Sequence, residues 1–142
     1  MISLDDLYQS VILDHDRAPR NYGRLAAPTG SAEGYNPLCG DRLVVMVRLV
    51  GDTLHEIRFE ATSCSIARAS ASLMTLSLAG RTTAETQRLA DAFEEMLRGK
   101  AEPGPALGEL TALAGVRRFP SRIRCATLAW SAVLDALRPP TA

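Results

Sequence analysis

The segment Asn36-Pro37-Leu38-Cys39-Gly40-Asp41 joins two strand-like stretches, residues 30–36 and residues 43–50. Its proline fixes φ and its glycine permits backbone angles that other residues avoid, so the pair predicts a tight turn. Such a turn presents the Cys39 thiol and the Asp41 carboxylate outward from one short loop. The segment therefore marks both the end of a predicted sheet and a candidate site.

The sequence on either side of this turn predicts the strands of the sheet. Residues 43–50 are rich in β-branched side chains and apolar on both faces, as is typical of a well-covered strand. Gly51-Asp52 is a two-residue hairpin signal, and residues 54–61 follow it with alternating apolar and charged side chains. With residues 30–36 as a third, weaker strand, we expect a small antiparallel sheet of about three strands.

Most of the remaining chain has the apolar spacing of helices. The expected helices cover residues 4–15, 65–79, 82–98 and 106–114, and the last begins near Ser121. Ser3 is the expected N-cap of the first helix, and Gly80 the expected end of the second. The apolar stripe of the second helix comprises Ile66, Ala69, Leu73 and Leu76. A capping-box pattern, Thr82 to Glu85, opens the third, and residues 99–105 are a predicted surface loop. The pattern predicts an α+β fold, with the sheet packed against several helices.

Length and composition limit the classes of function. The chain has 142 residues, which predicts one domain over residues 1–142 with a frayed tail at 139–142. Sixteen basic and 16 acidic residues leave no net charge, so we expect neither nucleic acid nor membrane as a partner. An odd number of cysteines and an acidic N-terminal stretch argue against an exported, disulfide-bonded protein. We therefore expect a cytoplasmic location, where thiols stay free.

The chain has 3 cysteines, and Cys64 and Cys125 lie far from Cys39 in the sequence. Three thiolates and the Asp41 carboxylate are a complete tetrahedral ligand set for zinc. Spacing alone favours the alternative that these cysteines are small buried hydrophobic residues, because no Cys-x-x-Cys pair occurs. However, Cys64 and Cys125 are both predicted in or just before the first turn of a helix, where free N–H groups stabilise a thiolate.

Arginines surround the third cysteine. Arg122 and Arg124 flank Cys125, and Arg117 and Arg118 lie just upstream. Arginines in the first turn of a helix oppose its dipole, which indicates a function or a compensating charge. Three thiolates and a carboxylate around a divalent ion total minus two, a charge that these arginines would offset. The alternative is a solvated basic helix end. The residues thus predict a metal–thiolate site, holding either zinc or an iron–sulfur cluster.

Each of the two histidines has a simple structural interpretation. His15 ends the first predicted helix, where a histidine is more often a C-terminal cap than a ligand or proton carrier. His55 falls in the predicted strand over residues 54–61 and is interpreted as an exposed strand residue.

A series of short motifs resembles the U-type iron–sulfur cluster assembly proteins, the IscU/NifU N-terminal-like family, over residues 4 to about 135. The motifs are Leu7-Tyr8, Asp14-His15, Pro19-Arg20-Asn21, Asn36 to Asp41, Cys64-Ser65-Ile66, Ala69 to Ser72, Gly115-Val116, Phe119-Pro120, Arg122-Ile123 and Cys125 to Trp130. The resemblance implies a SufE/NifU-like α+β domain whose three cysteines and one aspartate converge at one end.

Three departures favour the SufU-like branch of this family. Arg124 replaces the histidine that precedes the third cysteine in IscU-like scaffolds. The sequence Val116-Arg117-Arg118-Phe119-Pro120 replaces their Leu-Pro-Pro-Val-Lys chaperone motif. The 60 residues between Cys64 and Cys125 exceed their spacing.

The SufU-like resemblance implies a function in iron–sulfur cluster biogenesis. Zinc would be held by Cys39, Asp41, Cys64 and Cys125. A SufS-like cysteine desulfurase would take over part of the zinc coordination and free Cys39 to accept persulfide sulfur for the downstream cluster-assembly machinery. Arg122 would stabilise the released carboxylate or thiolates.

Two alternatives use the same residues. In the first, the chain is a scaffold on which a [2Fe–2S]-type cluster is assembled on Cys39, Cys64 and Cys125 and then passed on. In the second, zinc only stabilises the fold.

Overall fold

The computed structural model of the protein describes residues 4–102 and 104–138. Its elements are α1 (Leu4–Arg17), β1 (Gly30–Asn36), β2 (Asp41–Val50), β3 (Thr53–Thr62), α2 (Ser65–Leu78), α3 (Thr83–Leu97), the 3₁₀ segment η1 (Pro105–Arg118) and α4 (Pro120–Leu137). The predicted N-cap Ser3 and the predicted tail at 139–142 lie outside the described residues. Among the described residues, no helix combines the length and apolar character that a membrane span needs.

The three predicted strands form one antiparallel sheet in the order β1-β2-β3, which confirms the expected fold class. A register shift between Arg48 and Leu49 of β2 makes the third strand depart from simple alternation. Arg48 pairs with Glu56 and Leu49 with Leu54, so His55 is the extra residue of a bulge. The bulge lets Leu54 and Ile57 both be buried, although they are three residues apart. His55 is exposed, as predicted.

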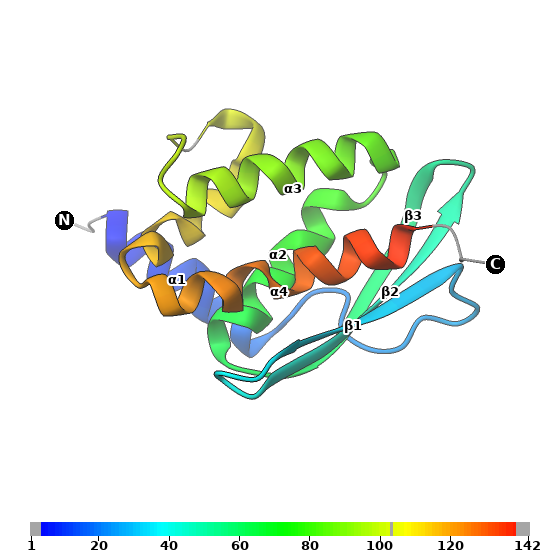
Figure 1. Ribbon diagram of the computed structural model, residues 1–142, viewed down its shortest axis with the longest axis horizontal. Coiled ribbons are helices and arrows are strands. Elements are labelled where there is room, and N and C mark those ends of the chain that lie inside the picture. Colours follow the sequence, from blue (N-terminus) through cyan, green and yellow to red (C-terminus); the bar gives the residue numbers. More distant parts are fainter. Residues whose placement is uncertain (1–3, 103, 139–142) are drawn as a thin grey trace.

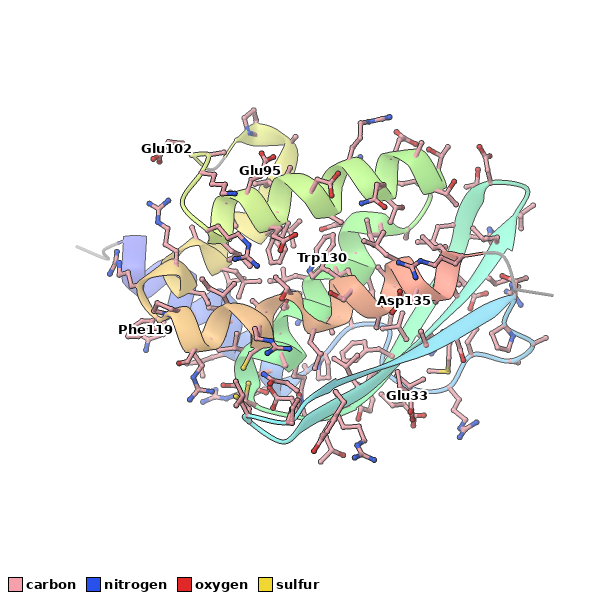
Figure 2. The ribbon with its side chains drawn as sticks, viewed as in Figure 1. Glu33, Glu95, Glu102, Phe119, Trp130 and Asp135 are labelled. Atoms are coloured by element: carbon pink, nitrogen blue, oxygen red, sulfur yellow. The ribbon has the colours of Figure 1, made fainter. Side chains whose placement is uncertain are left out.

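The helices form layers over one face of the sheet. Helices α4 and α2 contact the strands, and α3 packs over α4 and η1 on the side away from the sheet (Figure 1). Trp130 lies between α4 and α3 (Figure 2). Its ring stacks on Phe93 of α3 at a centroid distance of 4.7 Å and joins the two helices. Large side chains that are almost fully buried fill the space between the layers, among them Leu54, Phe59, Leu73, Met74, Leu78, Phe93, Met96, Leu97, Leu110 and Leu113.

A glycine in β1 brings α4 close to the sheet. A Cβ atom on Gly34 would lie 3.0 Å from Leu128 Cγ, a distance that a larger residue would have to relieve. Gly34, Asn36 and Asp41 are buried on the helix-facing side of the hairpin, where Asn36 pairs with Asp41. Cys125 precedes Leu128 by about one helical turn on α4. This close approach therefore places Cys125 beside the end of the β1–β2 hairpin.

Helix α2 has the predicted bounds to within one residue, but its predicted apolar stripe is partly wrong. Leu76 is 49% exposed, and Met74 and Leu78 are buried instead. The small side chains of this helix allow α1, α4 and β3 to approach it closely, so most of its circumference is covered. Leu76 lies on the side that remains open to solvent.

The predicted helix over residues 106–114 is also wrong in extent and type. Residues 105–118 form η1, a 3₁₀ segment broken by a non-helical backbone at Gly108, where φ is 52°. The glycine permits this left-handed conformation, so the chain turns within the segment rather than continuing as one short helix. Segment η1 ends one residue before Phe119, the residue that precedes α4.

The predicted C-terminal cap at His15 is wrong, because α1 continues to Arg17 and the imidazole is buried. His15 Nδ1 lies 2.7 Å from Ser72 Oγ on α2, and Nε2 lies 3.8 Å from Glu109 Oε2. The Arg20 backbone N–H also donates to Ser72 Oγ, at 2.8 Å. His15 therefore joins α1 to α2 through a buried hydrogen bond. Burial, and then the charge of Arg20, lower its pKa.

Candidate metal–thiolate site

The loop that carries Cys39 is ordered by the residue that precedes it. The Asn36 carbonyl accepts hydrogen bonds from the N–H groups of Cys39, at 3.3 Å, and Gly40, at 2.8 Å. Its side-chain Oδ1 accepts a further bond from the Leu38 N–H, at 3.2 Å. Gly40 has φ of 72°, a conformation that favours glycine. The predicted tight turn is confirmed, and it presents Cys39 on the surface. The prediction that it also presents the Asp41 carboxylate outward is wrong, because Asp41 is buried where it partners the start of α2.

Asp41 connects this loop to the start of α2. Its Oδ1 accepts a hydrogen bond of 2.8 Å from the Cys64 N–H, and its Oδ2 lies 3.5 Å from Cys64 Sγ. Cys64 is the N-cap of α2, as predicted, but its own side chain makes no capping bond. The carboxylate of Asp41, which is only 2% exposed, therefore partners the backbone N–H at the beginning of this helix from a different element.

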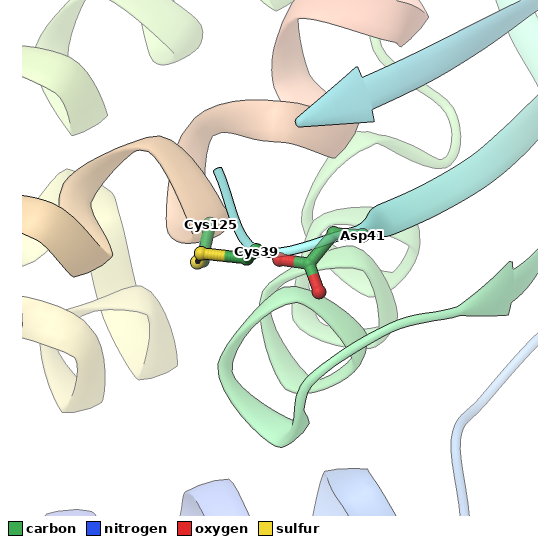
Figure 3. Close-up of side chains that lie close together, drawn as sticks. All are labelled: Cys39, Asp41 and Cys125. Carbon is green, nitrogen blue, oxygen red and sulfur yellow. Dashed lines mark hydrogen bonds between the residues drawn. The ribbon is translucent and has the colours of Figure 1, made fainter. Parts of the chain in front are cut away.

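Cys125 lies deeper than predicted. Helix α4 begins at Pro120, so Cys125 is its sixth residue and falls in the second turn, outside the free N–H groups of the first. Its thiol is fully buried, 3.5 Å from Cys39 Sγ, and the Asn36 Nδ2 group points to it at 4.0 Å. Figure 3 shows Cys39, Asp41 and Cys125 at one end of the β1–β2 hairpin.

The surroundings of Cys125 give its thiol a different pKa from that of an ordinary surface thiol. Burial raises the pKa of Cys125, and hydrogen bonding to Asp41 and Cys39 raises it further. This reverses the expectation that a helix dipole would stabilise its thiolate. The pKa of Arg122 is raised, first by its hydrogen bond to Cys125 and then by electrostatic interaction with the side chains of Cys64 and Cys125.

The candidate ligands lie at and behind an open pocket of about 670 Å³. The residues that line it are Leu38, Cys39, Gly40, Asp41, Thr62, Ser63, Cys64, Ser121 and Arg122. Exposure falls from Cys39 to Cys64 to Cys125, so the three thiols differ in access from solvent. Of the four arginines singled out in the sequence, Arg122 alone lines this pocket, among the residues that the structure describes.

Three of the four predicted ligands, Cys39, Asp41 and Cys125, match the dimensions of a zinc site. One oxygen of Asp41 and the sulfurs of Cys39 and Cys125 lie within 4.8 Å of one another. Zn–S bonds of about 2.3 Å and Zn–O bonds of about 2.0 Å in a tetrahedron separate two sulfurs by about 3.8 Å, and a sulfur from an oxygen by about 3.5 Å. The Cys39–Cys125 and Cys64–Asp41 separations are both 3.5 Å. Cys39, Asp41 and Cys125 therefore fit such an ion, whereas Cys64 is outside this group and reaches it through Asp41.

Two supporting interactions were not predicted from the sequence. Asn36 lies in the turn motif, but the hydrogen bond from its side-chain amide to Cys125 Sγ depends on how closely α4 approaches β1. On α2, Ser70 Oγ donates to the Ala126 carbonyl at 2.5 Å and accepts from Trp130 Nε1 at 3.2 Å. The only indication of this bond in the sequence is that Ser70 is polar and lies among small apolar residues of α2. The two hydrogen bonds of Ser70 fix α2 to α4 next to Cys125.

The chain matches a known protein family over almost its whole length. Residues 7–137 match the family described as the NifU-like N terminal domain. The chain is 41% identical over 132 residues to the zinc-dependent sulfurtransferase SufU of Bacillus subtilis, covering 92% of this chain and 89% of that protein. It is 39% identical over 136 residues to the iron–sulfur cluster assembly scaffold protein IscU of Streptococcus pyogenes, covering 95% and 85% of the two chains.

A solved structure has the same fold. The chain superposes with a TM-score of 0.86 on the crystal structure of a candidate iron–sulfur cluster assembly scaffold protein for the SUF system from Fervidobacterium islandicum. The two are 27% identical, and the superposition covers 90% of this chain and 94% of that one. The resemblance inferred from the short motifs is thus confirmed at the level of the family.

Proposed function

Because this chain belongs to the NifU-like N-terminal domain family, we propose that it accepts and carries persulfide sulfur in iron–sulfur cluster biogenesis, in a zinc-dependent manner. The observation that carries the proposal is the position of Cys39. Its thiol is exposed on a hairpin turn at an open pocket, with the other candidate ligands beside or behind it. A thiol that takes sulfur from another protein has to be reachable, and Cys39 meets that requirement better than buried Cys125.

Each residue of the site has a separate role in this proposal. Cys39 is the acceptor, and its sulfur attacks the persulfide of the donor protein. Asp41 and Cys64 stay linked through the start of α2, which keeps this side of the site in place while the Cys39 loop moves. Arg122 is exposed at the pocket, where its positive charge stabilises the thiolates. A bound Zn²⁺ supplies a positive centre that keeps its cysteine ligands deprotonated.

The surroundings of the pocket suit a protein partner. Leu38, which is 78% exposed, precedes Cys39, and Phe119, which is 62% exposed, lies at the start of α4 three residues before Arg122. Figure 2 shows Phe119 at the edge of the molecule, in contrast to the enclosed Trp130. Large apolar side chains that are exposed beside a site favour docking of another protein. The proposed partner is a SufS-like cysteine desulfurase, with the cluster-assembly machinery as the recipient of the sulfur.

A scaffold function is the second candidate, and the 39% identity to the Streptococcus pyogenes scaffold favours it. In that case Cys39, Cys64 and Cys125 ligate an iron–sulfur cluster, for which cysteine thiolates are the usual ligands. The two candidates place different cargo on the same residues.

Cysteine desulfurase turnover separates the two functions. The cognate enzyme is assayed with zinc-loaded, metal-free and iron-loaded protein, each as wild type and as Cys39→Ser. We expect stimulation by the zinc-loaded wild type alone, and none by Cys39→Ser, whose circular dichroism spectrum stays native. Uptake of iron and acid-labile sulfide without stimulation would instead support the scaffold function. Equal stimulation by Cys39→Ser would exclude Cys39 as the acceptor.

A further inference from the structure

We propose that Cys125 is a resolving thiol that discharges sulfur from Cys39 as sulfide, with formation of a Cys39–Cys125 disulfide. The inference rests on the proposed function, because it begins with a persulfide on Cys39. It adds a reaction that carriage alone does not include. A chain with this reaction delivers free sulfide, whereas a pure carrier hands its outer sulfur to another thiol.

The two sulfur atoms lie close enough to react. Cys39 Sγ and Cys125 Sγ lie 3.5 Å apart, which is within van der Waals reach and longer than the roughly 2.0 Å of a disulfide bond. Closing this gap takes a small movement of the exposed hairpin turn that carries Cys39. By contrast, Cys64 is outside the group that Cys39, Asp41 and Cys125 form, and its sulfur contacts Asp41 Oδ2 at 3.5 Å instead. Cys125 is therefore the thiol placed to attack Cys39.

The two thiols differ in exposure to solvent. Cys39 is exposed and lines the open pocket, whereas Cys125 is fully buried and does not line it. An outside donor therefore reaches Cys39 first. The outer sulfur of a persulfide on Cys39 extends into the pocket, and Cys125 approaches from the protein interior. This arrangement suits displacement at the inner sulfur, with the leaving group opposite the attacking atom and close to Arg122, which also lines the pocket.

The reaction balances without an added oxidant. The Cys125 sulfur forms a bond to the inner sulfur of the Cys39 persulfide, and the bond between the inner and outer sulfurs breaks. The outer sulfur leaves as hydrosulfide. Where Cys125 reacts as a thiol rather than as a zinc-bound thiolate, its proton converts the hydrosulfide to hydrogen sulfide. The persulfide supplies the oxidising equivalents, since its outer sulfur is reduced to sulfide while the two cysteines become a disulfide. A dithiol reductant then returns the pair to thiols with two electrons and two protons.

A small aromatic disulfide tests, without any desulfurase, whether Cys125 attacks a sulfur bound to Cys39. Reduced, metal-free protein is treated at low concentration with one equivalent of dithiobis-nitrobenzoate, whose coloured aryl thiolate halves are counted by absorbance. Cys39 releases one half and keeps the other, and Cys125 then displaces the second half. We expect release of both halves from the wild type and a Cys39–Cys125 disulfide in the peptide map.

Matched cysteine variants identify the resolving residue. In Cys64→Ser the only cysteines are Cys39 and Cys125, and we expect release of both halves as in the wild type. In Cys125→Ser we expect the second half to leave at least tenfold more slowly, with the aryl group retained on Cys39. If Cys125→Ser does not fold, the map of the wild type and of Cys64→Ser still decides. A stable aryl adduct on Cys39 in the wild type, or a Cys39–Cys64 disulfide, would overturn the inference.

In a second experiment, the desulfurase and cysteine place persulfide sulfur on Cys39. The enzyme is then removed, and the released sulfide is measured without added thiol. We expect one sulfide per persulfide from the wild type and a retained persulfide in Cys125→Ser. Persulfide that persists in the wild type would contradict the reaction. Absence of loading combined with a positive aromatic-disulfide test would reject the proposed acceptor function while supporting the exchange between Cys39 and Cys125.

Discussion

Two helices of this protein begin in different ways. Helix α3 has a complete capping box, in which Thr82 Oγ1 accepts from the Glu85 N–H at 3.1 Å and Glu85 Oε1 accepts from the Thr82 N–H at 2.9 Å. Helix α2 begins at Cys64, whose side chain makes no capping bond. The acceptor for the Cys64 N–H is Asp41, 23 residues earlier in the chain and on a strand.

The difference shows where the sequence favours local stability and where it serves the site. The capping box of α3 uses residues three positions apart and touches no candidate ligand. The start of α2 uses a cysteine in place of a serine or threonine cap, and it depends on a carboxylate that is itself a candidate ligand. Changes at the start of α2 should therefore affect metal binding, whereas changes at the start of α3 should affect stability alone.

The largest effect is expected from removal of Asp41. Asp41→Ala removes a proposed ligand together with the acceptor for the Cys64 N–H. We expect zinc affinity to fall by at least ~100-fold, because loss of a group that only supports a metal ligand already lowers affinity by up to about 100-fold. Competition with a chromophoric chelator measures this affinity. Asp41→Asn keeps a neutral acceptor for the N–H group, so its metal-free form should unfold in urea close to wild type while zinc affinity stays low. Wild-type affinity in Asp41→Asn would contradict the ligand assignment.

A smaller loss of zinc affinity is expected from a substitution of Asn36. It tests whether the hydrogen bond from β1 to Cys125 on α4 also supports the site. Asn36→Asp keeps an oxygen for the Leu38 N–H but replaces the amide group that points to Cys125 Sγ. We expect zinc affinity to fall by roughly 10-fold. The thiolate-to-cobalt absorption of the Co²⁺-substituted protein should shift as well. An unchanged spectrum and affinity would show that this amide does not act on Cys125.

Thr82→Ala removes the local cap of α3. Loss of the capping bond should lower the free energy of unfolding by about 1 kcal/mol and leave zinc affinity unchanged. Urea unfolding and chelator competition measure the two quantities. Thr83→Ala, at the adjacent first helical position, is the matched control and should change stability less. A drop in zinc affinity in Thr82→Ala would mean that the two helix starts are coupled.

The smallest effect is a pH dependence that arises at His15. Burial lowers the pKa of His15 in the folded protein below the ordinary value of about 6.5. The unfolded chain therefore binds the proton more readily, and stability falls as the pH decreases below about 6.5. The charge of Arg20 adds to this lowering of the pKa, whereas the charges of Asp14 and Glu109 oppose it.

The pH dependence can be assigned with the second histidine of the chain. His15→Gln should flatten the loss of stability between neutral and mildly acidic pH, measured by thermal unfolding. His55→Gln, which changes an exposed strand residue, should retain the wild-type dependence. The same slope in His15→Gln and wild type would show that another group is responsible.

Local patterns explain which parts of the fold could be predicted from the sequence. The hairpin at Gly51-Asp52, the capping box at Thr82 and the end of α2 at Gly80 each depend on a few adjacent residues, and all three are confirmed. The departures lie where distant segments decide the outcome. Leu76 is exposed because other elements cover the remaining sides of α2. His15 is buried because Ser72 offers it a partner on another helix.

The site was predicted in its residue types but not in its depth. The three cysteines and Asp41 were identified from their chemistry and from the motifs around them, and their ligand roles remain a prediction. That Cys125 lies in the second turn of α4 follows from the start of this helix at Pro120, and its burial from the packing of α4 against β1. Neither the 3.5 Å separation of its sulfur from Cys39 nor the Asn36 bond is encoded in local spacing.

The most direct test of the proposed function is to locate the transferred sulfur. Zinc-loaded protein is mixed with cysteine desulfurase and cysteine, quenched by alkylation within one turnover, and digested for peptide mapping by mass spectrometry. We expect an added sulfur on the peptide that contains Cys39 and none on the peptides that contain Cys64 or Cys125. An added sulfur on Cys64 or Cys125, with Cys39 unmodified, would contradict the proposed function.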